Sequence, residues 1–224
     1  MPTQPLTVTP NLPLARVPQL PRPTTWVPAE RDGAQMMADT LATWRAMGPR
    51  PDLWVFGYAS LVWRPEFDAV ETRRARVHGH HRCLQMWSRI NRGTPERPGL
   101  VFALMRGGSV QGLALRIPHE QVEVSMPALW AREMPNPVYD PKWLLCQTAQ
   151  GTVPALAFTL SRRSPNFTGA LSPERYRDIF AHSVGRYGST FDYAHQTLHG
   201  LRAHGIEDRA LARLLHLAAP SVGA

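Results

Sequence analysis

The chain has 224 residues, of which 43% are hydrophobic and 19% charged, so a packed core can form and general disorder is excluded. No run approaches the ~18 consecutive apolar residues of a transmembrane helix, and no membrane partner is expected. The two cysteines cannot make a disulfide framework, and the N-terminus lacks the pattern of a signal peptide. The expected location is therefore cytoplasmic.

The formal net charge of +8 first suggests a nucleic-acid partner. However, Lys142 is the only lysine among the 25 basic residues, and the arginines are scattered with no run longer than a pair. Binding to nucleic acid depends on basic residues that gather on one surface. The sequence therefore favours a protein without a nucleic-acid partner, and it leaves the oligomeric state open.

The first 30 residues contain eight of the 22 prolines. Because each proline fixes φ and removes an N–H donor, this segment is expected to be an extended arm. An apolar residue at every third or fourth position predicts a helix over 32–47, which Gly48-Pro49 ends. These features predict a division into a Pro-rich arm with a short helix, 1–50, and a larger domain, 51–219.

The larger domain begins with short apolar runs bounded by Gly, Pro and Asn, which predict strands over 53–57, 74–78, 82–87, 100–105, 110–117, 143–148 and 153–160. Gly107-Gly108 indicates a hairpin between two of these strands. Helices are predicted over 120–133, after the N-cap Ser172, and near 190–203 and 207–218. The pattern indicates an α+β fold, a small mixed β-barrel or sheet with helices packed outside.

The run Phe56-Gly57-Tyr58-Ala59-Ser60-Leu61-Val62-Trp63 is the most informative stretch. A buried strand ends at Gly57, and the turn that follows can direct backbone N–H groups outward as a cradle for an anion or oxyanion. A tight turn packed by its aromatic residues is the alternative interpretation.

Glu133 ends the predicted helix 120–133. The negative end of the helix dipole and partial burial would both raise the pKa of this carboxyl, toward the range of a general base at neutral pH. An ordinary solvated glutamate is the alternative. Glu66, Asp68 and Glu71 form an acidic cluster that we interpret as a solvated face, with a second carboxylate near the pocket left open.

No metal site is expected, because strand alternation places His78, His80, His81 and Cys83 on different faces.

Four ordered segments resemble the ChaC-like γ-glutamylcyclotransferases. Phe56–Trp63 is similar to the family's FGYGSLxW signature, and residues 129–134 resemble the W-x-R-E-M segment that carries the family's catalytic glutamate. Arg92-Gly93-Thr94 with Arg97-Pro98-Gly99 is similar to its RGT…PG loop, and 111–118 matches its G-x-A-x-R-x-P strand. The resemblance covers about residues 53–215.

The resemblance implies an enzyme that cleaves glutathione by cyclising its γ-glutamyl group to 5-oxoproline, with release of cysteinylglycine. It implies Glu133 as general base and acid, with no metal and no cofactor. The substrate-binding residues that it implies are Tyr58, Ala59, Ser60, Leu61, Arg92, Gly93, Tyr139 and Tyr193. A cyclotransferase on another γ-glutamyl peptide or amine, or a non-catalytic γ-glutamyl-binding module, is the alternative.

Two residues depart from what the resemblance and the helix pattern require. Ala59 stands where the family has glycine, so it would be strained at positive φ, whereas at negative φ its methyl group would only narrow the pocket. Pro127 lies inside the helix that leads to Glu133. Since proline removes a helical hydrogen bond, we predict a break there, with Ser125 as the cap of a restarted helix.

Overall fold

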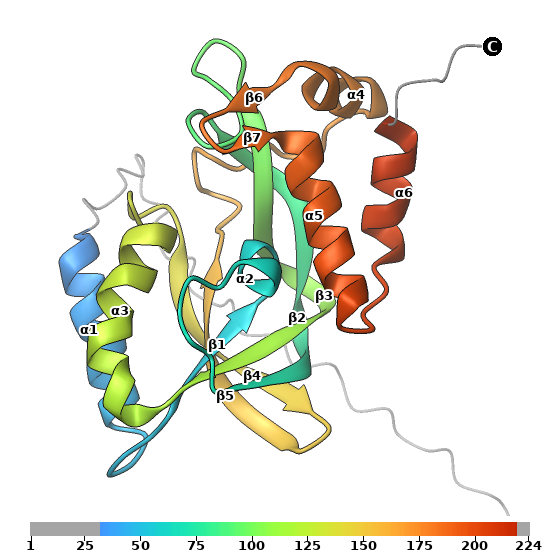
Figure 1. The fold of residues 1–224 in the computed structure, drawn as a ribbon. Helices are drawn as coiled ribbons and strands as arrows, with labels where there is room; N and C mark the ends of the chain where they lie inside the picture. The colour runs from blue at the N-terminus through green and yellow to red at the C-terminus, as the bar shows by residue number, and fades with distance from the viewer. Residues whose placement is uncertain (1–31, 219–224) are drawn as a thin grey trace, which may run out of the picture. The chain divides into compact units, whose positions relative to one another are not determined.

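In the computed structural model, which describes residues 32–218, five strands close into a barrel (Figure 1). In chain order the elements are α1 (Gly33–Arg45), β1 (Leu53–Gly57), α2 (Ser60–Trp63), β2 (Glu71–Ser88), β3 (Gly99–Ile117), α3 (His119–Glu133), β4 (Asp140–Thr148), β5 (Gly151–Thr159), α4 (Pro173–His182), β6 (Val184–Gly185), β7 (Gly188–Ser189), α5 (Thr190–Ala203) and α6 (Arg209–Ala218).

The strands follow the order β1-β3-β2-β4-β5 around the barrel. Neighbouring strands are antiparallel except β1 and β5, whose parallel pairing of Trp54 with Ala155 closes the barrel. β1 is buried along its whole length, which explains why its sequence is a continuous apolar run. The helices pack outside the barrel, so the predicted α+β fold with a mixed barrel is confirmed.

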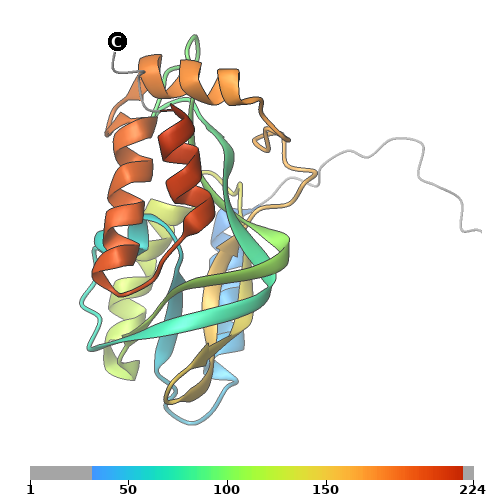
Figure 2. The ribbon, with the colours of Figure 1, turned by 90° about the vertical axis from the view of Figure 1, so that its right-hand side faces the viewer.

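The hairpin predicted at Gly107-Gly108 is wrong. Residues 99–117 form one long strand that pairs with β2 along its length, so four of the predicted strands merge into two. Gly79 of β2, at φ 77°, lies opposite Gly107 and Gly108, at φ 108° and 72°, and the pairing register shifts there. The glycines therefore form a β-bulge that redirects both strands without reversing the chain. Figure 2 shows the two strands bending together.

The helix predicted over 32–47 is α1, which lies beside α3 (Figure 1). The Trp44 ring stacks on His119 with a centroid separation of 5.3 Å, and Arg45 Nη2 lies 2.6 Å from Glu123 Oε1. The Pro-rich arm lies outside the described residues, and the division at residue 50 stays a prediction.

The break predicted at Pro127 is wrong, because α3 runs without interruption from His119 to Glu133. Pro127 is exposed, so its ring lies on the outer face and only the Glu123 carbonyl loses its helical donor. The inner face is buried through Val122, Met126, Leu129 and Trp130. This packing holds the helix together where local propensity would end it.

The predicted C-terminal helices are α4, α5 and α6, and their caps follow the sequence. Ser172 Oγ accepts a hydrogen bond from the Arg175 amide, Ser189 Oγ accepts one from the Asp192 amide, and Gly205 follows α5 at φ 67°. α5 and α6 lie side by side against the long strands, with α4 across one end (Figures 1 and 2). Within residues 32–218, no helix has the length and apolarity needed to span a bilayer.

Removing Pro127 tests this account of α3. Because its side chain is exposed, Pro127→Ala restores a helical N–H without loss of packing, and we expect the free energy of unfolding to rise by about 1 to 3 kcal/mol. Pro173→Ala is the matched control, because Pro173 is also exposed but occupies the first turn of α4, where proline is favoured. Equal urea midpoints for the two variants would contradict the prediction.

Candidate active site

The turn after β1 is fixed from two sides. Arg82 Nη1 donates a hydrogen bond to the Tyr58 carbonyl at 2.8 Å, and Arg82 Nη2 pairs with Asp208 Oδ2 at 2.5 Å. The chain then enters the one-turn helix α2, whose Trp63 Nε1 donates to Thr197 Oγ1 of α5 at 3.2 Å. The Val62 amide donates to the Ala59 carbonyl at 2.9 Å, whereas the amides of Ser60 and Leu61 precede the first hydrogen bond of this short helix.

Ala59 occupies a negative φ of −141°, so the left-handed strain that a family glycine would relieve does not arise. The side chain of Ala59 is 6% exposed. That its methyl group narrows a pocket stays a prediction. Ser60, partly buried, is the first residue of α2.

Glu133 lies at the last residue of α3, with a side chain 15% exposed. Burial raises the pKa of this carboxyl, the negative charge of Glu66 raises it further, and the Arg132 guanidinium opposes both. The position of Glu133 at the C-terminus of the helix also raises the pKa of its carboxyl, because the helix dipole is negative at that end. The carboxyl therefore holds its proton more tightly than an exposed glutamate and is a stronger base when it ionises.

Three tyrosines from separate segments surround this carboxyl. Burial is the main cause that raises the pKa of Tyr58, Tyr139 and Tyr193, and the charge of Glu133 raises all three further. The pKa of Tyr193 reaches about 12. Tyr58 Oη donates to the Phe158 carbonyl at 2.9 Å, and its hydrogen bond with Tyr139 partly offsets the rise in the pKa of Tyr139. All three hydroxyls therefore stay protonated at neutral pH.

Arg92 joins this group from the loop between β2 and β3. Its guanidinium carbon lies 4.7 Å from the centre of the Tyr193 ring, and its Nη1 donates to the carbonyl of Tyr187. The side chain is buried, and burial lowers the pKa of Arg92. The guanidinium remains a fixed positive charge beside Tyr193.

Gly93 and Gly185 allow the Arg92 loop to pack backbone against backbone. A Cβ on Gly93 would lie 2.1 Å from the Gly99 nitrogen, and a Cβ on Gly185 would lie 2.4 Å from the Gly93 nitrogen. The β6–β7 hairpin thus holds the loop through main-chain contacts. Gly93 has a packing role here, and its predicted contact with substrate stays a prediction.

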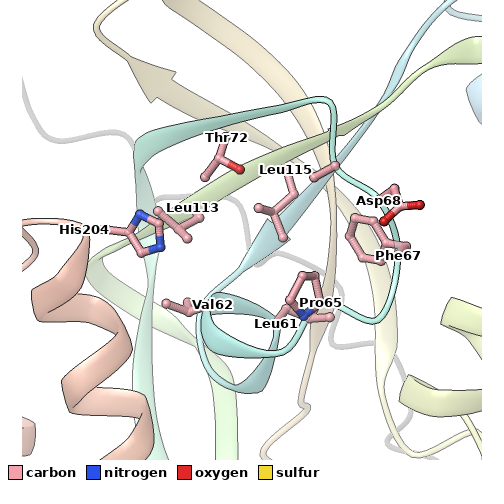
Figure 3. A pocket seen from close by; sticks show the side chains of 10 residues that line it. Leu61, Val62, Pro65, Phe67, Asp68, Thr72, Leu113, Leu115 and His204 are labelled. Atoms are coloured by element: carbon pink, nitrogen blue, oxygen red, sulfur yellow. The ribbon is translucent and has the colours of Figure 1, made fainter.

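Leu61 lines a cavity that the predicted catalytic glutamate and tyrosines do not line. It lines a cavity of about 300 Å³ beside α2, together with Asp68, Thr72 and His204 (Figure 3). Neither Glu133 nor any of the three tyrosines lines this cavity. The carboxyl, the tyrosines and Arg92 therefore form a site distinct from it.

Arg132 is a residue of the site that the sequence did not single out, and Glu66 is an exposed acid that reaches it. Arg132 Nε lies 3.2 Å from Glu133 Oε1, and its Nη1 lies 3.0 Å from Glu66 Oε2. Glu66 and Asp68 are exposed, as expected of a solvated face, whereas Glu71 is partly buried and its Oε2 lies 2.9 Å from Arg116 Nε. The sequence left open a second carboxylate near the pocket, and Glu66 is such a carboxylate because it pairs with Arg132.

The chemistry available at the site is proton transfer and anion binding. Its groups are one carboxyl with a raised pKa, three protonated hydroxyls and two guanidinium groups. Among residues 32–218, no three His, Cys, Asp or Glu side chains gather in an arrangement that could hold a metal ion.

Known proteins share this fold. The crystal structure of a γ-glutamyl cyclotransferase specific to glutathione from yeast superposes with a TM-score of 0.67, over 75% of this chain and 95% of that one. The two sequences are 19% identical, so this likeness concerns the fold alone.

Sequence relatives extend over most of the chain. The glutathione-specific gamma-glutamylcyclotransferase of Escherichia coli (strain K12) is 32% identical over 183 residues, which cover 81% of this chain and 78% of the relative. The human glutathione-specific gamma-glutamylcyclotransferase 1 is 30% identical over 158 residues, 66% of this chain and 71% of the relative. Residues 53–220 match the ChaC-like protein family. The chain therefore belongs to the ChaC-like protein family.

Proposed function

We propose that the protein cleaves glutathione by intramolecular cyclisation of its γ-glutamyl group, giving 5-oxoproline and cysteinylglycine. The observation that carries the proposal is the largely buried Glu133 carboxyl, whose pKa burial raises, the direction that a base for neutral pH requires. Family membership and relatives named as glutathione-specific gamma-glutamylcyclotransferases support the choice of substrate.

Glu133 would move both protons of the reaction. Its carboxylate takes a proton from the α-ammonium group of the substrate, and the freed amine attacks the γ-carbonyl to close a five-membered lactam. The same carboxyl then returns a proton to the departing amine of cysteinylglycine. Because the nucleophile belongs to the substrate, the protein contributes mainly by fixing its approach.

The turn from Tyr58 to Leu61 would bind the γ-glutamyl end. The amides of Ser60 and Leu61 would donate hydrogen bonds to the negative charge that develops on the γ-carbonyl oxygen. Tyr139 and Tyr193 would donate hydrogen bonds, and Arg92 would attract a substrate carboxylate. Glutathione is anionic, and the net charge of +8 favours its approach.

A second γ-glutamyl substrate is the nearest alternative, because the Ala59 methyl group changes the shape of the turn. A panel of γ-glutamyl peptides and amines, compared by kcat/KM, decides between them. A non-catalytic γ-glutamyl-binding module would bind glutathione without releasing 5-oxoproline.

The proposal also includes a cytoplasmic location and a catalytic domain over 51–219. Cys83 and Cys146 are both free, as expected in a reducing compartment. In this proposal the Pro-rich arm and its short helix, 1–50, precede the catalytic domain.

Replacing the proposed base tests the function. Glu133→Gln keeps the shape of the side chain but cannot carry a proton, so we expect kcat for 5-oxoproline formation from glutathione to fall about 10²- to 10⁴-fold. Glu123→Gln removes an exposed carboxylate from the same helix and should retain the full rate. Chromatography of the products measures both. A wild type without product, or an active Glu133→Gln variant, would refute the proposal.

The same variant has a pH-dependent effect on stability. Because burial raises the pKa of Glu133 above its ordinary value of 4.5, the folded state binds this proton more tightly than the unfolded chain. The carboxyl therefore lowers the free energy of unfolding as the pH rises from 4.5 through its raised pKa. Below pH 4.5 it has no such effect. We expect Glu133→Gln to unfold at higher urea than wild type at pH 7, with the difference vanishing below 4.5. A constant difference across pH would argue against a raised pKa.

Gly185 provides a test of the Arg92 loop. Gly185→Ala would place a methyl group 2.6 Å from the backbone nitrogen of Arg92, so the loop must shift and Arg92 with it. We expect a loss of about 1 to 3 kcal/mol in stability and a raised KM for glutathione. Gly48→Ala is the control, because its Cβ would have open space. If Gly185→Ala matches this control in KM, Arg92 does not bind substrate.

A further inference from the structure

Four charged side chains form a chain of ion pairs that ends at Glu133. Arg64 Nε lies 2.5 Å from Glu66 Oε1, Glu66 Oε2 lies 3.0 Å from Arg132 Nη1, and Arg132 Nε lies 3.2 Å from Glu133 Oε1. Arg132 Nη1 is buried, but its N–H bonds are not directed at Glu66 in hydrogen-bond geometry. Arg132 is thus divided between two carboxylates.

The backbone of Glu66 is also unusual. Its φ is 59°, and among residues 32–218 it is the one non-glycine residue with positive φ. An L-residue in this left-handed conformation is strained, and such strain persists where surrounding contacts require it. The carboxylate of this residue is the one that pairs with both Arg64 and Arg132.

The division of Arg132 affects Glu133 directly. A guanidinium that pairs with one carboxylate alone can bind it through two parallel N–H groups, which stabilises the ionised form. A carboxylate stabilised in this way is a weaker base. Glu66 pairs with Nη1 of the same guanidinium, so the positive charge of Arg132 is shared between two carboxylates and stabilises the ionised form of Glu133 less than an exclusive pair would.

We propose that Glu66 is a positioning residue for the reaction: its carboxylate holds Arg132 in an ion pair shared with Glu133, so that Arg132 stabilises the ionised form of Glu133 less and Glu133 stays available as the base. The inference rests on the proposed function. The negative charge of Glu66 also raises the pKa of Glu133. The charged and titratable groups around Glu133 are Arg132 of α3, Glu66 after α2, Tyr58 after β1, Tyr139 before β4 and Tyr193 of α5.

The test is the pH dependence of kcat/KM for glutathione. In Glu66→Gln the carboxylate is lost and the charge of Arg132 acts on Glu133 alone, so the acid limb of the profile should move to lower pH by about half a unit. Glu66→Gly should give the same shift, although glycine relaxes the backbone at this φ. Glu123→Gln, the matched control for loss of one carboxylate, should leave the limb in place.

A second readout does not require activity. The ¹³C signal of the Glu133 side-chain carboxyl, assigned by its loss in Glu133→Gln, should titrate at lower pH in Glu66→Gln than in wild type. A wild type that forms no 5-oxoproline refutes the proposed function, and this titration still reports on Glu66. If the titration is the same in both proteins, Glu66 has only a structural role and the inference is overturned.

Discussion

The burial of one carboxyl is the constraint on which the site depends. Glu133 ends α3, whose inner face packs into the core through Val122, Met126 and Leu129. That packing keeps the helix continuous through Pro127 and takes the Glu133 side chain out of water. Removal from water raises the pKa of this carboxyl, and the same effect makes it a base and a source of instability. The fold thus gives up some stability to keep this carboxyl largely away from water.

The remaining groups reach Glu133 because the barrel brings distant segments together. Tyr58 follows β1, Tyr139 precedes β4, and Tyr193 belongs to α5. Arg82 fixes the first of these segments through the Tyr58 carbonyl. The long strands β2 and β3 bend at their glycine bulge, and the loop that joins them carries Arg92 to the ring of Tyr193. The site therefore depends on contacts between segments, which no single segment specifies.

Local pattern was sufficient for some elements and not for others. The apolar run of β1 and the serine caps of α4 and α5 can be predicted from the local sequence. The family resemblance indicated Glu133 and the three tyrosines as candidate site residues. The Gly107-Gly108 pair is compatible with a hairpin and with a β-bulge, and only its pairing with β2 decides between the two. Pro127 breaks an isolated helix, but packing overrides it. Glu66 resembles any surface acid, because its link to Arg132 spans separate segments.

The most direct test of the central claim is the pH profile of the wild-type protein acting on glutathione. If a buried Glu133 is the base, the acid limb of kcat/KM for 5-oxoproline formation lies above the ordinary glutamate pKa of 4.5. Formation of 5-oxoproline at an undiminished rate down to pH 4.5, or none at any pH, would contradict the account.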